Sequence, residues 1–344
     1  MLTLTYFNPP KHEVICLTQP VLEISQLKLH FFTDKGVVKA VDGVDLTVKE
    51  GEIVGLVGES GCGKSVTSLS VMGLVPQPPG KIVAGSIRFQ GKDLTHWKAR
   101  QMRSIRGNEM AMIFQEPMTS LNPLFTIGNQ LIEAIRTHRK CSKKEAISMA
   151  LQMLEKVGIK RPGILNDYPH QLSGGMRQRV MIAMAMVLNP RLLIADEPTT
   201  ALDVTIQAQI LDLMKSLNKE FGTAILLITH DLGVVAEMCD RVVVMYAGQV
   251  VEETDRHRLY RDPKHPYTQG LLKSIPKLDD QKERLYSIRG QVPNPLQMPQ
   301  GCRFAPRCEY AMEICRRKEP QLLPVEKEHL SRCWLHQEES EKQP

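Results

Sequence analysis

Residues 58–65, Gly-Glu-Ser-Gly-Cys-Gly-Lys-Ser, combine the residue types that bind a nucleoside triphosphate. The run fits the pattern G-x-x-x-x-G-K-[ST], follows an expected strand at 53–57 and opens an expected helix. Glycines let backbone N–H groups converge on phosphate oxygens, and the helix N-terminus adds partial positive charge. We therefore expect Lys64 to reach the β- and γ-phosphates and Ser65 to bind Mg²⁺.

Two adjacent acidic residues have the chemistry that hydrolysis of such a nucleotide needs. Asp196 and Glu197 follow the apolar run 192–195, which predicts a buried strand. Asp196 is expected to hold Mg²⁺, and Glu197 to polarise a water in line with the γ-phosphate. Adjacent acids can also form a solvated turn, but the glycine-rich loop in the same chain favours the catalytic interpretation.

A second glycine-containing element lies further along the chain. Ser173, Gly174 and Gly175 precede a long apolar helix. A serine and two glycines before a helix indicate another anion-binding helix N-terminus. The chain therefore carries two phosphate-binding elements, which need not serve the same nucleotide.

The surrounding pattern predicts an α/β fold that positions these motifs. Apolar alternation or short apolar runs predict strands near 22–31, 44–48, 53–57, 192–195 and 224–228, and 242–251 reads as a hairpin. Residues 128–190 read as largely helical, so strands alternate with helices. We interpret 1–20 as a loose leader. Repeated prolines after about residue 254 predict a boundary between a domain at 21–254 and an extension at 255–344.

The composition is that of an ordinary globular protein. The 344 residues are 42% hydrophobic and 24% charged with a net charge of +6, which excludes disordered and fibrous classes. The longest wholly apolar run, about nine residues at 180–188, is far short of the ~20 that a membrane-spanning helix needs. No secretory signal is visible, so we expect a cytosolic protein. The mild charge, without interleaved basic and aromatic residues, predicts no nucleic-acid partner.

Together these motifs resemble those of ABC transporter ATP-binding subunits. Residues 58–65 are similar to the Walker A motif, 172–176 to the signature, 192–196 to Walker B and 201–203 to the D-loop. The resemblance implies a P-loop ABC ATPase, with a RecA-like core and antiparallel β and helical subdomains, that binds ATP and Mg²⁺. It implies catalytic roles for Glu197, His230 and Gln115, and Mg²⁺ ligation by Ser65, Gln115 and Asp196. The residues implied to contact ATP are Phe31, Gly58, Ser60, Gly61, Cys62, Gly63, Lys64, Ser65, Val66, Ser173, Gly174, Gly175 and Asp203.

The same resemblance implies that ATP is shared between two ATPase subunits. ATP at the Walker A motif of one subunit is capped by the signature loop of the other, so Ser173 and Gly175 would contact ATP on the partner. Gln115 would link the site to the membrane subunits. Phe31 is the aromatic residue that we expect to stack on adenine, with Phe32 as the alternative.

Residues 263–273, which contain His265-Pro266-Tyr267, and residues 116–123 resemble oligopeptide and dipeptide importers. The resemblance implies an ATPase that energises import of di- and oligopeptides at the cytoplasmic face of the membrane. The implied partners are a second homologous ATPase subunit, two membrane permease subunits and an extracytoplasmic peptide-binding protein. The alternatives are the same machinery with nickel, glutathione or murein peptides as cargo, an exporter ATPase, and a soluble ABC ATPase that acts on nucleic acid.

Four of the eight cysteines lie in the extension, at Cys302, Cys308, Cys315 and Cys333. Stable disulfides are not expected in the cytosol, and thiolates suit iron–sulfur clusters or zinc. The spacing lacks the paired C-x2-C of zinc ribbons and the ferredoxin run, so it predicts only a four-thiolate metal site, with unliganded thiols as the alternative. The resemblance favours a [4Fe-4S] cluster over Zn²⁺. We expect this metal to stabilise a short segment with little core of its own.

Cys62 lies within the glycine-rich loop, close to a helix N-terminus and to Lys64. Both neighbours should lower the pKa of its thiol. We therefore expect alkylation of Cys62 to block ATP binding, and ATP to protect the thiol.

Overall fold

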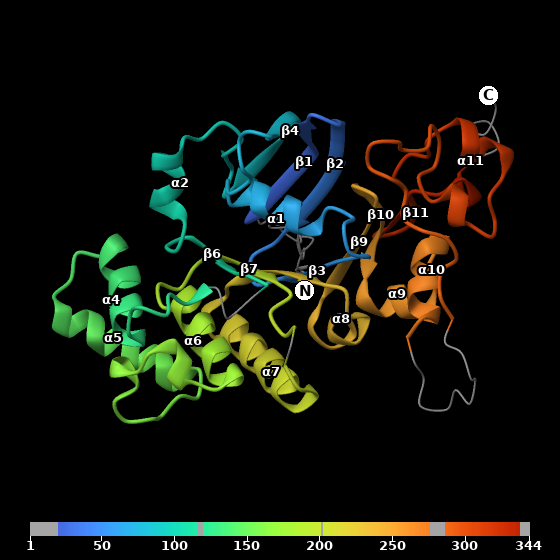
Figure 1. Ribbon diagram of the computed structural model, residues 1–344. Coiled ribbons are helices and arrows are strands. Elements are labelled where there is room, and N and C mark those ends of the chain that lie inside the picture. The colour runs from blue at the N-terminus through green and yellow to red at the C-terminus, as the bar shows by residue number, and fades with distance from the viewer. Residues whose placement is uncertain (1–19, 116–119, 201, 276–285, 338–344) are drawn as a thin grey trace, which may run out of the picture.

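Two sheets organise the computed structural model, which describes residues 20–115, 120–200, 202–275 and 286–337 (Figure 1). The strands are β1 (Leu22–Thr33), β2 (Gly36–Val48), β3 (Ile53–Val57), β4 (Gly80–Phe89), β5 (Lys92–Asp93), β6 (Met110–Ile113), β7 (Leu192–Asp196), β8 (Ala224–Thr229), β9 (Arg241–Tyr246), β10 (Gln249–Asp255), β11 (Leu323–Glu326) and β12 (His329–Ser331). An antiparallel sheet has the order β2-β1-β4-β5, and a second sheet has the order β11-β12-β10-β9-β3-β8-β7-β6.

Ten α-helices of the described residues surround these sheets. They are α1 (Lys64–Val71), α2 (Ala99–Ile105), α4 (Ile127–His138), α5 (Lys143–Lys156), α6 (Gly174–Met186), α7 (Val204–Phe221), α8 (Leu232–Met238), α9 (Arg256–Arg261), α10 (Pro266–Lys273) and α11 (Glu313–Arg317). Short 3-10 turns at Ile164–Asn166 and Pro169–Gln171 interrupt the helical region between α5 and α6. Among these helices, none combines the length and hydropathy that a membrane crossing requires.

The centre of the larger sheet is parallel, because β9, β3, β8, β7 and β6 pair side by side in one direction. Strands β3 and β8 are buried along their whole length, as expected for parallel strands covered on both faces. Successive side chains of β8 enter different cores: Ile225 and Leu227 join one, and Leu226 and Ile228 join the other. The apolar runs seen in the sequence are therefore strands with two buried faces.

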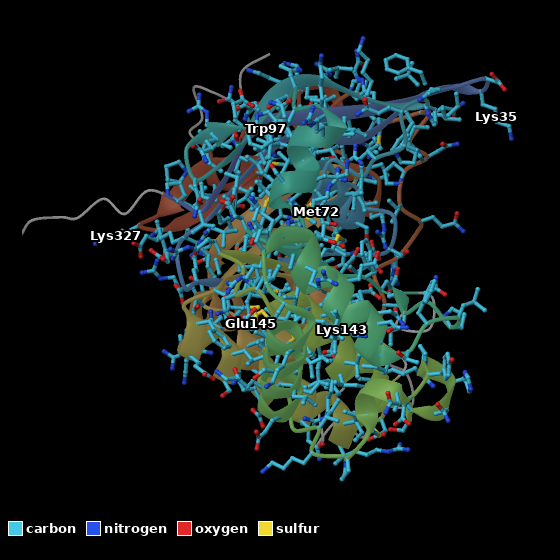
Figure 2. The ribbon with its side chains drawn as sticks, turned by 90° about the vertical axis from the view of Figure 1, so that its left-hand side faces the viewer. Lys35, Met72, Trp97, Lys143, Glu145 and Lys327 are labelled. Atoms are coloured by element: carbon cyan, nitrogen blue, oxygen red, sulfur yellow. The ribbon has the colours of Figure 1, made fainter. Side chains whose placement is uncertain are left out.

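The two cores separate three layers. One core lies between the parallel strands and helices α4 to α8, and the other joins these strands to α1 and the antiparallel sheet. Figure 1 shows the antiparallel sheet on one side of the parallel strands and α4 to α7 on the other. In Figure 2, Met72, which follows α1, lies between Trp97 and the start of α5 at Lys143 and Glu145. The α/β prediction, with antiparallel and helical parts, is confirmed.

The C-terminal extension continues the larger sheet. Strand β12 pairs antiparallel with β10, with Glu252 opposite Ser331 and Glu253 opposite Leu330, and β11 pairs with β12. Leu259, Tyr267 and Phe304 belong to the same core as the parallel strands. The sheet and the core thus run across residue 255, where the composition of the chain changes. The expected leader lies almost wholly outside the described residues.

Candidate active site

The glycine-rich loop joins the end of β3 to the start of α1, and its shape depends on glycine. Gly58 and Gly63 have φ angles of 150° and 104°, a region that side chains with a Cβ rarely adopt. A Cβ at Gly58 would lie 2.2 Å from the carbonyl oxygen of Met245, and one at Gly63 would lie 2.5 Å from that of Ala40. The loop is therefore packed closely against β9 and β2, while Ser60 and Gly61 remain exposed.

Lys64 folds back over this loop. Its side chain is buried, and its ammonium group donates to the carbonyl oxygens of Gly58 at 2.7 Å and Glu59 at 3.1 Å. These carbonyl groups are neutral, so a phosphate oxygen could replace one of them as a stronger, charge-assisted partner of the ammonium. Val66, two residues further on, packs partly against the core beneath the antiparallel sheet.

Cys62 differs from the expectation. Its side chain is 1% exposed and belongs to the core beneath the antiparallel sheet. Burial raises the pKa of its thiol, and this effect outweighs the opposite effect of Lys64. The prediction of a lowered pKa was therefore wrong, because proximity in sequence to a cation does not reveal that the thiol is withdrawn from water.

Asp196 and Ser65 form a donor set that fits Mg²⁺. Asp196 ends β7, is 5% exposed and shares a side-chain hydrogen bond with Ser65. Its Oδ1 atom is buried without a hydrogen-bond partner, which is unusual for a carboxylate oxygen. Burial raises the pKa of Asp196, although the Ser65 bond and the charge of Lys64 oppose this. A buried, unpartnered carboxylate oxygen beside a hydroxyl is the kind of site that Mg²⁺ occupies.

Glu197 stands at the centre of a cluster of polar side chains. Its φ angle is 48°, a conformation that costs a non-glycine residue free energy and is typical of functional positions. Its Oε2 accepts from Gln115 Nε2 at 2.9 Å and from Thr200 Oγ1 at 3.0 Å, and its Oε1 lies 3.0 Å from His230 Nδ1. Burial alone would raise the pKa of Glu197, but the hydrogen bonds from His230 and Thr200 bring it below its usual range.

The structure thus brings together Gln115, Glu197 and His230, which were singled out from three separate regions of the sequence. Gln115 presents its amide nitrogen to Glu197, whereas Mg²⁺ ligation would use its amide oxygen. Sequence reasoning missed Thr200, although a threonine three residues after Glu197 is a signal for a local side-chain hydrogen bond. It also missed Gln178, which lies in α6 and donates to the carbonyl oxygen of Pro198, next to Glu197.

Ser173 and Asp203 each begin a helix. The Ser173 hydroxyl accepts from the backbone N–H of Met176 at 3.3 Å at the start of α6, and Asp203 accepts from that of Ile206 at 2.9 Å at the start of α7. A Cβ at Gly175 would lie 3.0 Å from the Ile206 side chain, so the two helix N-termini are neighbours. Ser173, Gly174 and Asp203 are exposed, while Ala201 and the stretch 116–119 lie outside the described residues.

Phe31 lies in β1 and packs partly against the core beneath the antiparallel sheet, whereas Phe32 is 51% exposed. Phe31 pairs with Val38 of β2, two residues before Ala40, which borders the glycine-rich loop. The register therefore places Phe31 near the glycine-rich loop, but the described residues show no contact between its side chain and the loop.

The four cysteines of the extension are free thiols that influence one another. Burial raises the pKa of Cys333 to about 12 and that of Cys302 to about 11. The charges of Cys302, Cys308 and Cys315 all act on Cys333, and the backbone of Leu335 hydrogen bonds to its sulfur. Across the described residues, however, no three or more His, Cys, Asp or Glu side chains are arranged as a metal site. The four sulfurs therefore influence one another, but the described side chains are not arranged as the expected four-thiolate centre.

Comparison with known proteins gives the family. Residues 41–200 match the ABC transporter family, and residues 251–315 match the oligopeptide/dipeptide transporter C-terminal region. The oligopeptide transport ATP-binding protein AppD of Bacillus subtilis is 56% identical over 94% of this chain and 99% of its own. The dipeptide transport ATP-binding protein DppD of Escherichia coli is 50% identical over 91% of this chain and 96% of its own.

Solved structures agree with this result. The dimeric post-hydrolysis state of the ATP-binding cassette MJ0796 bound to ADP and Pi has a TM-score of 0.62 and 28% identity, and it covers 68% of this chain and 98% of that one. CbiO1 from Clostridium perfringens, part of the ABC transporter complex CbiONQ, has a TM-score of 0.60 and 26% identity over 71% of this chain and 91% of that one. The chain therefore belongs to the ABC transporter ATPases that carry the oligopeptide/dipeptide transporter C-terminal region.

Proposed function

We propose that this chain is the ATP-hydrolysing subunit that energises import of di- and oligopeptides through a membrane ABC permease. The observation that carries the proposal is the convergence of Gln115, Thr200 and His230 on the carboxylate of Glu197, one residue after Asp196. The names of the relatives AppD and DppD, which refer to oligopeptide and dipeptide transport, support the cargo.

In this proposal the chain first binds the phosphates of ATP and then activates the attacking water. The loop N–H groups and Lys64 hold the β- and γ-phosphates, and Ser65 and Asp196 hold Mg²⁺, with Gln115 able to join them through its amide oxygen. Bound Mg²⁺ would neutralise charge on the phosphate oxygens. The backbone of Gly58 to Val66 supplies the remaining contacts, and Phe31 stacks on adenine.

Glu197 accepts the proton of the attacking water. Its lowered pKa keeps the carboxylate ionised at neutral pH, as a base must be. Because a carboxylate only accepts hydrogen bonds, the Nδ1 atom of His230 carries the proton in their contact. Nε2 of His230 is then left to contact the γ-phosphate or the water. Gln115 and Thr200 fix the other carboxylate oxygen, so that the base is held in one orientation.

We propose that the site is completed by a second, homologous ATPase subunit. Ser173, Gly174 and Asp203 lie at exposed, neighbouring helix N-termini, which suit the phosphates of a nucleotide held by a partner. The dimeric form named for the cassette MJ0796 supports this arrangement. ATP then bridges the two subunits, and its hydrolysis separates them.

We propose that the chain works with two membrane permease subunits and that a groove of about 330 Å³ is where one of them docks. Met72, Phe114 and Met184 line it, and Phe114 is 42% exposed. Gln115 directly follows Phe114, so movement of a docked permease would reach the Glu197 cluster through one residue. We propose that the chain works at the cytoplasmic face of the membrane, with a peptide-binding protein on the other side.

We further propose that Cys302, Cys308, Cys315 and Cys333 hold a structural metal centre, a [4Fe-4S] cluster with Zn²⁺ as the alternative. Their mutual electrostatic influence supports this, and the centre would stabilise the extension rather than take part in hydrolysis. Protein purified without oxygen should contain iron and sulfide, and the Cys315→Ser variant should lose both. Protein with no iron, sulfide or zinc would contradict the proposal.

Uptake experiments test the cargo and the ATPase together. Cells that lack this chain would receive either the wild type or Glu197→Gln, and uptake of labelled di- and oligopeptides would be compared with uptake of nickel. Peptide uptake restored by the wild type alone is the expected result. Restoration of nickel uptake alone would keep the mechanism and reject peptides as cargo.

A further inference from the structure

The C-terminal extension holds the glycine-rich loop at Glu59, the second residue of that loop. The backbone N–H of Glu59 donates to the Tyr267 hydroxyl oxygen at 2.8 Å. The Glu59 carboxylate accepts two N–H bonds from Arg307, at 2.6 Å and 3.0 Å. Both the main chain and the side chain of one loop residue are therefore held by residues more than 200 positions away in the sequence.

Arg307 is suited to hold the Glu59 carboxylate in a fixed orientation. Its side chain is 4% exposed, and its guanidinium also donates to the carbonyl oxygen of Arg289 at 3.1 Å and contacts the Tyr246 hydroxyl at 3.4 Å. The hydrogen bond to Glu59 raises the pKa of Arg307 above its usual range, so the charge is permanent. A two-pronged bond between a buried guanidinium and a carboxylate is strong and directional.

The His-Pro-Tyr motif delivers Tyr267 to the loop. His265 Nδ1 accepts the backbone N–H of Tyr267 at 3.0 Å and so begins α10, and Pro266 occupies the first helical position, where no N–H is needed. The Tyr267 ring is fully buried, with its centroid 4.6 Å from that of Tyr246 and 5.4 Å from that of Phe304. The packing of the ring therefore fixes the position of the hydroxyl that bonds to Glu59.

Arg303, from the same short segment as Arg307, bonds to residues that lie next to the loop. It donates to the carbonyl oxygen of Ala247 at 2.6 Å and pairs with Asp42. The next residue, Gly248, donates its N–H to the carbonyl oxygen of Cys62 at 2.9 Å. Arg307 thus contacts the loop directly at Glu59, whereas Arg303 acts on it only through Ala247 and its neighbour Gly248.

We propose that Arg307 and Tyr267 are positioning residues for ATP, through which the extension keeps the glycine-rich loop in its nucleotide-binding shape. A phosphate loop binds well only when its N–H groups already converge, because ordering them upon binding costs conformational entropy. ATP binding and docking of the extension are then thermodynamically linked, and each favours the other. The inference concerns ATP binding alone and holds for any cargo.

The test is ATP affinity of the purified full chain, measured by titration calorimetry without permease. Arg307→Gln is expected to weaken ATP binding about tenfold, the size of one lost charge-assisted bond. Tyr267→Phe, which keeps the ring and loses the hydroxyl, is expected to weaken it by a few fold. Arg317→Gln is the matched control in the same extension, since Arg317 is exposed and pairs with nearby Glu313 at the surface. It should bind ATP like the wild type.

A double variant distinguishes positioning from general damage. Glu59→Gln combined with Arg307→Gln should bind ATP no more weakly than Arg307→Gln alone, because both changes remove the same contact. With the second ATPase subunit present, the ATPase activity of the single variants should reach the wild-type kcat at saturating ATP, with only KM raised. Unchanged ATP affinity in folded Arg307→Gln and Tyr267→Phe would overturn the proposal, as would additive losses in the double variant. If Arg307→Gln fails to fold, Tyr267→Phe alone decides.

Discussion

His265 makes the stability of this protein depend on pH. Its side chain is 1% exposed, and its Nδ1 accepts a hydrogen bond from the backbone of Tyr267, which requires that nitrogen to be unprotonated. Burial lowers the pKa of His265 from 6.5 to about 4, although the charge of Glu252 opposes the change. A proton on this ring would bury a charge and remove the first hydrogen bond of α10.

The sign and size of the effect follow from these values. Because the folded pKa lies below the unfolded one, the unfolded chain binds the proton first as the pH falls. The loss of stability caused by His265 is nil above about pH 6.5, grows as the pH falls toward 4 and is complete below that value. A pKa difference of about 2.5 corresponds to roughly 3 kcal/mol, of which about 2 kcal/mol is lost at pH 5.

Urea unfolding at pH 7.5 and pH 5 measures this loss. Trp334 is a local reporter because it lies in the extension, is 2% exposed and donates its ring N–H to the Lys318 carbonyl oxygen. Trp97→Phe would remove the other tryptophan of the chain. In that background His265→Asn keeps a side chain that can begin a helix but does not titrate. The histidine form should lose about 2 kcal/mol more than the asparagine form between the two pH values, and equal losses would refute the reasoning.

Three further predictions concern the ATP site. Glu197→Gln should lower the rate of ATP hydrolysis by about 10²–10⁴-fold at saturating ATP. Its ATP affinity should stay near that of the wild type, because the phosphate-binding residues are unchanged. Turnover at the wild-type rate would contradict the role of Glu197 as base. Lys64→Ala should remove ATP binding from the calorimetric range, since the loop loses the ammonium that it encloses; a retained signal would show that the glycine-rich backbone suffices. In the native protein, iodoacetamide should leave Cys62 unmodified with or without ATP, because the thiol is buried with a raised pKa. Peptide mass spectrometry checks this, and rapid labelling that ATP prevents would reinstate an exposed, activated thiol.

The strands and the phosphate-binding chemistry could be predicted because their signals are local. An apolar run with two buried faces, such as β8, looks the same in sequence as in the fold. Lys64 and Ser65 have roles set by their position in an eight-residue motif. The grouping of Gln115, Glu197 and His230 came from resemblance to a family, since nothing local indicates that three loops far apart in sequence meet.

Features that depend on distant partners could not be predicted. Cys62 was misjudged because its burial is produced by strands and a helix that its neighbours in sequence do not reveal. The bond between Glu59 and Arg307 joins residues 248 positions apart, and either residue alone is an ordinary surface type. Strands β11 and β12 have only 4 and 3 residues, too few to show a periodic pattern.

The pairing of β10 with β12 also protects the edge of the larger sheet from pairing with other chains. Without β12, β10 would be an edge strand with free N–H and C=O groups, and Glu252, fully buried and bonded to His329, would face water. Exposed edges of this kind recruit strands from other chains and aggregate. The outermost strand on this side of the sheet is instead β11, which is four residues long and contains Pro324 and Glu326. Short edges with proline and charge resist such pairing. A chain shortened to the ATPase motifs would therefore lose its protection against self-association along with its C-terminal contacts to the phosphate loop.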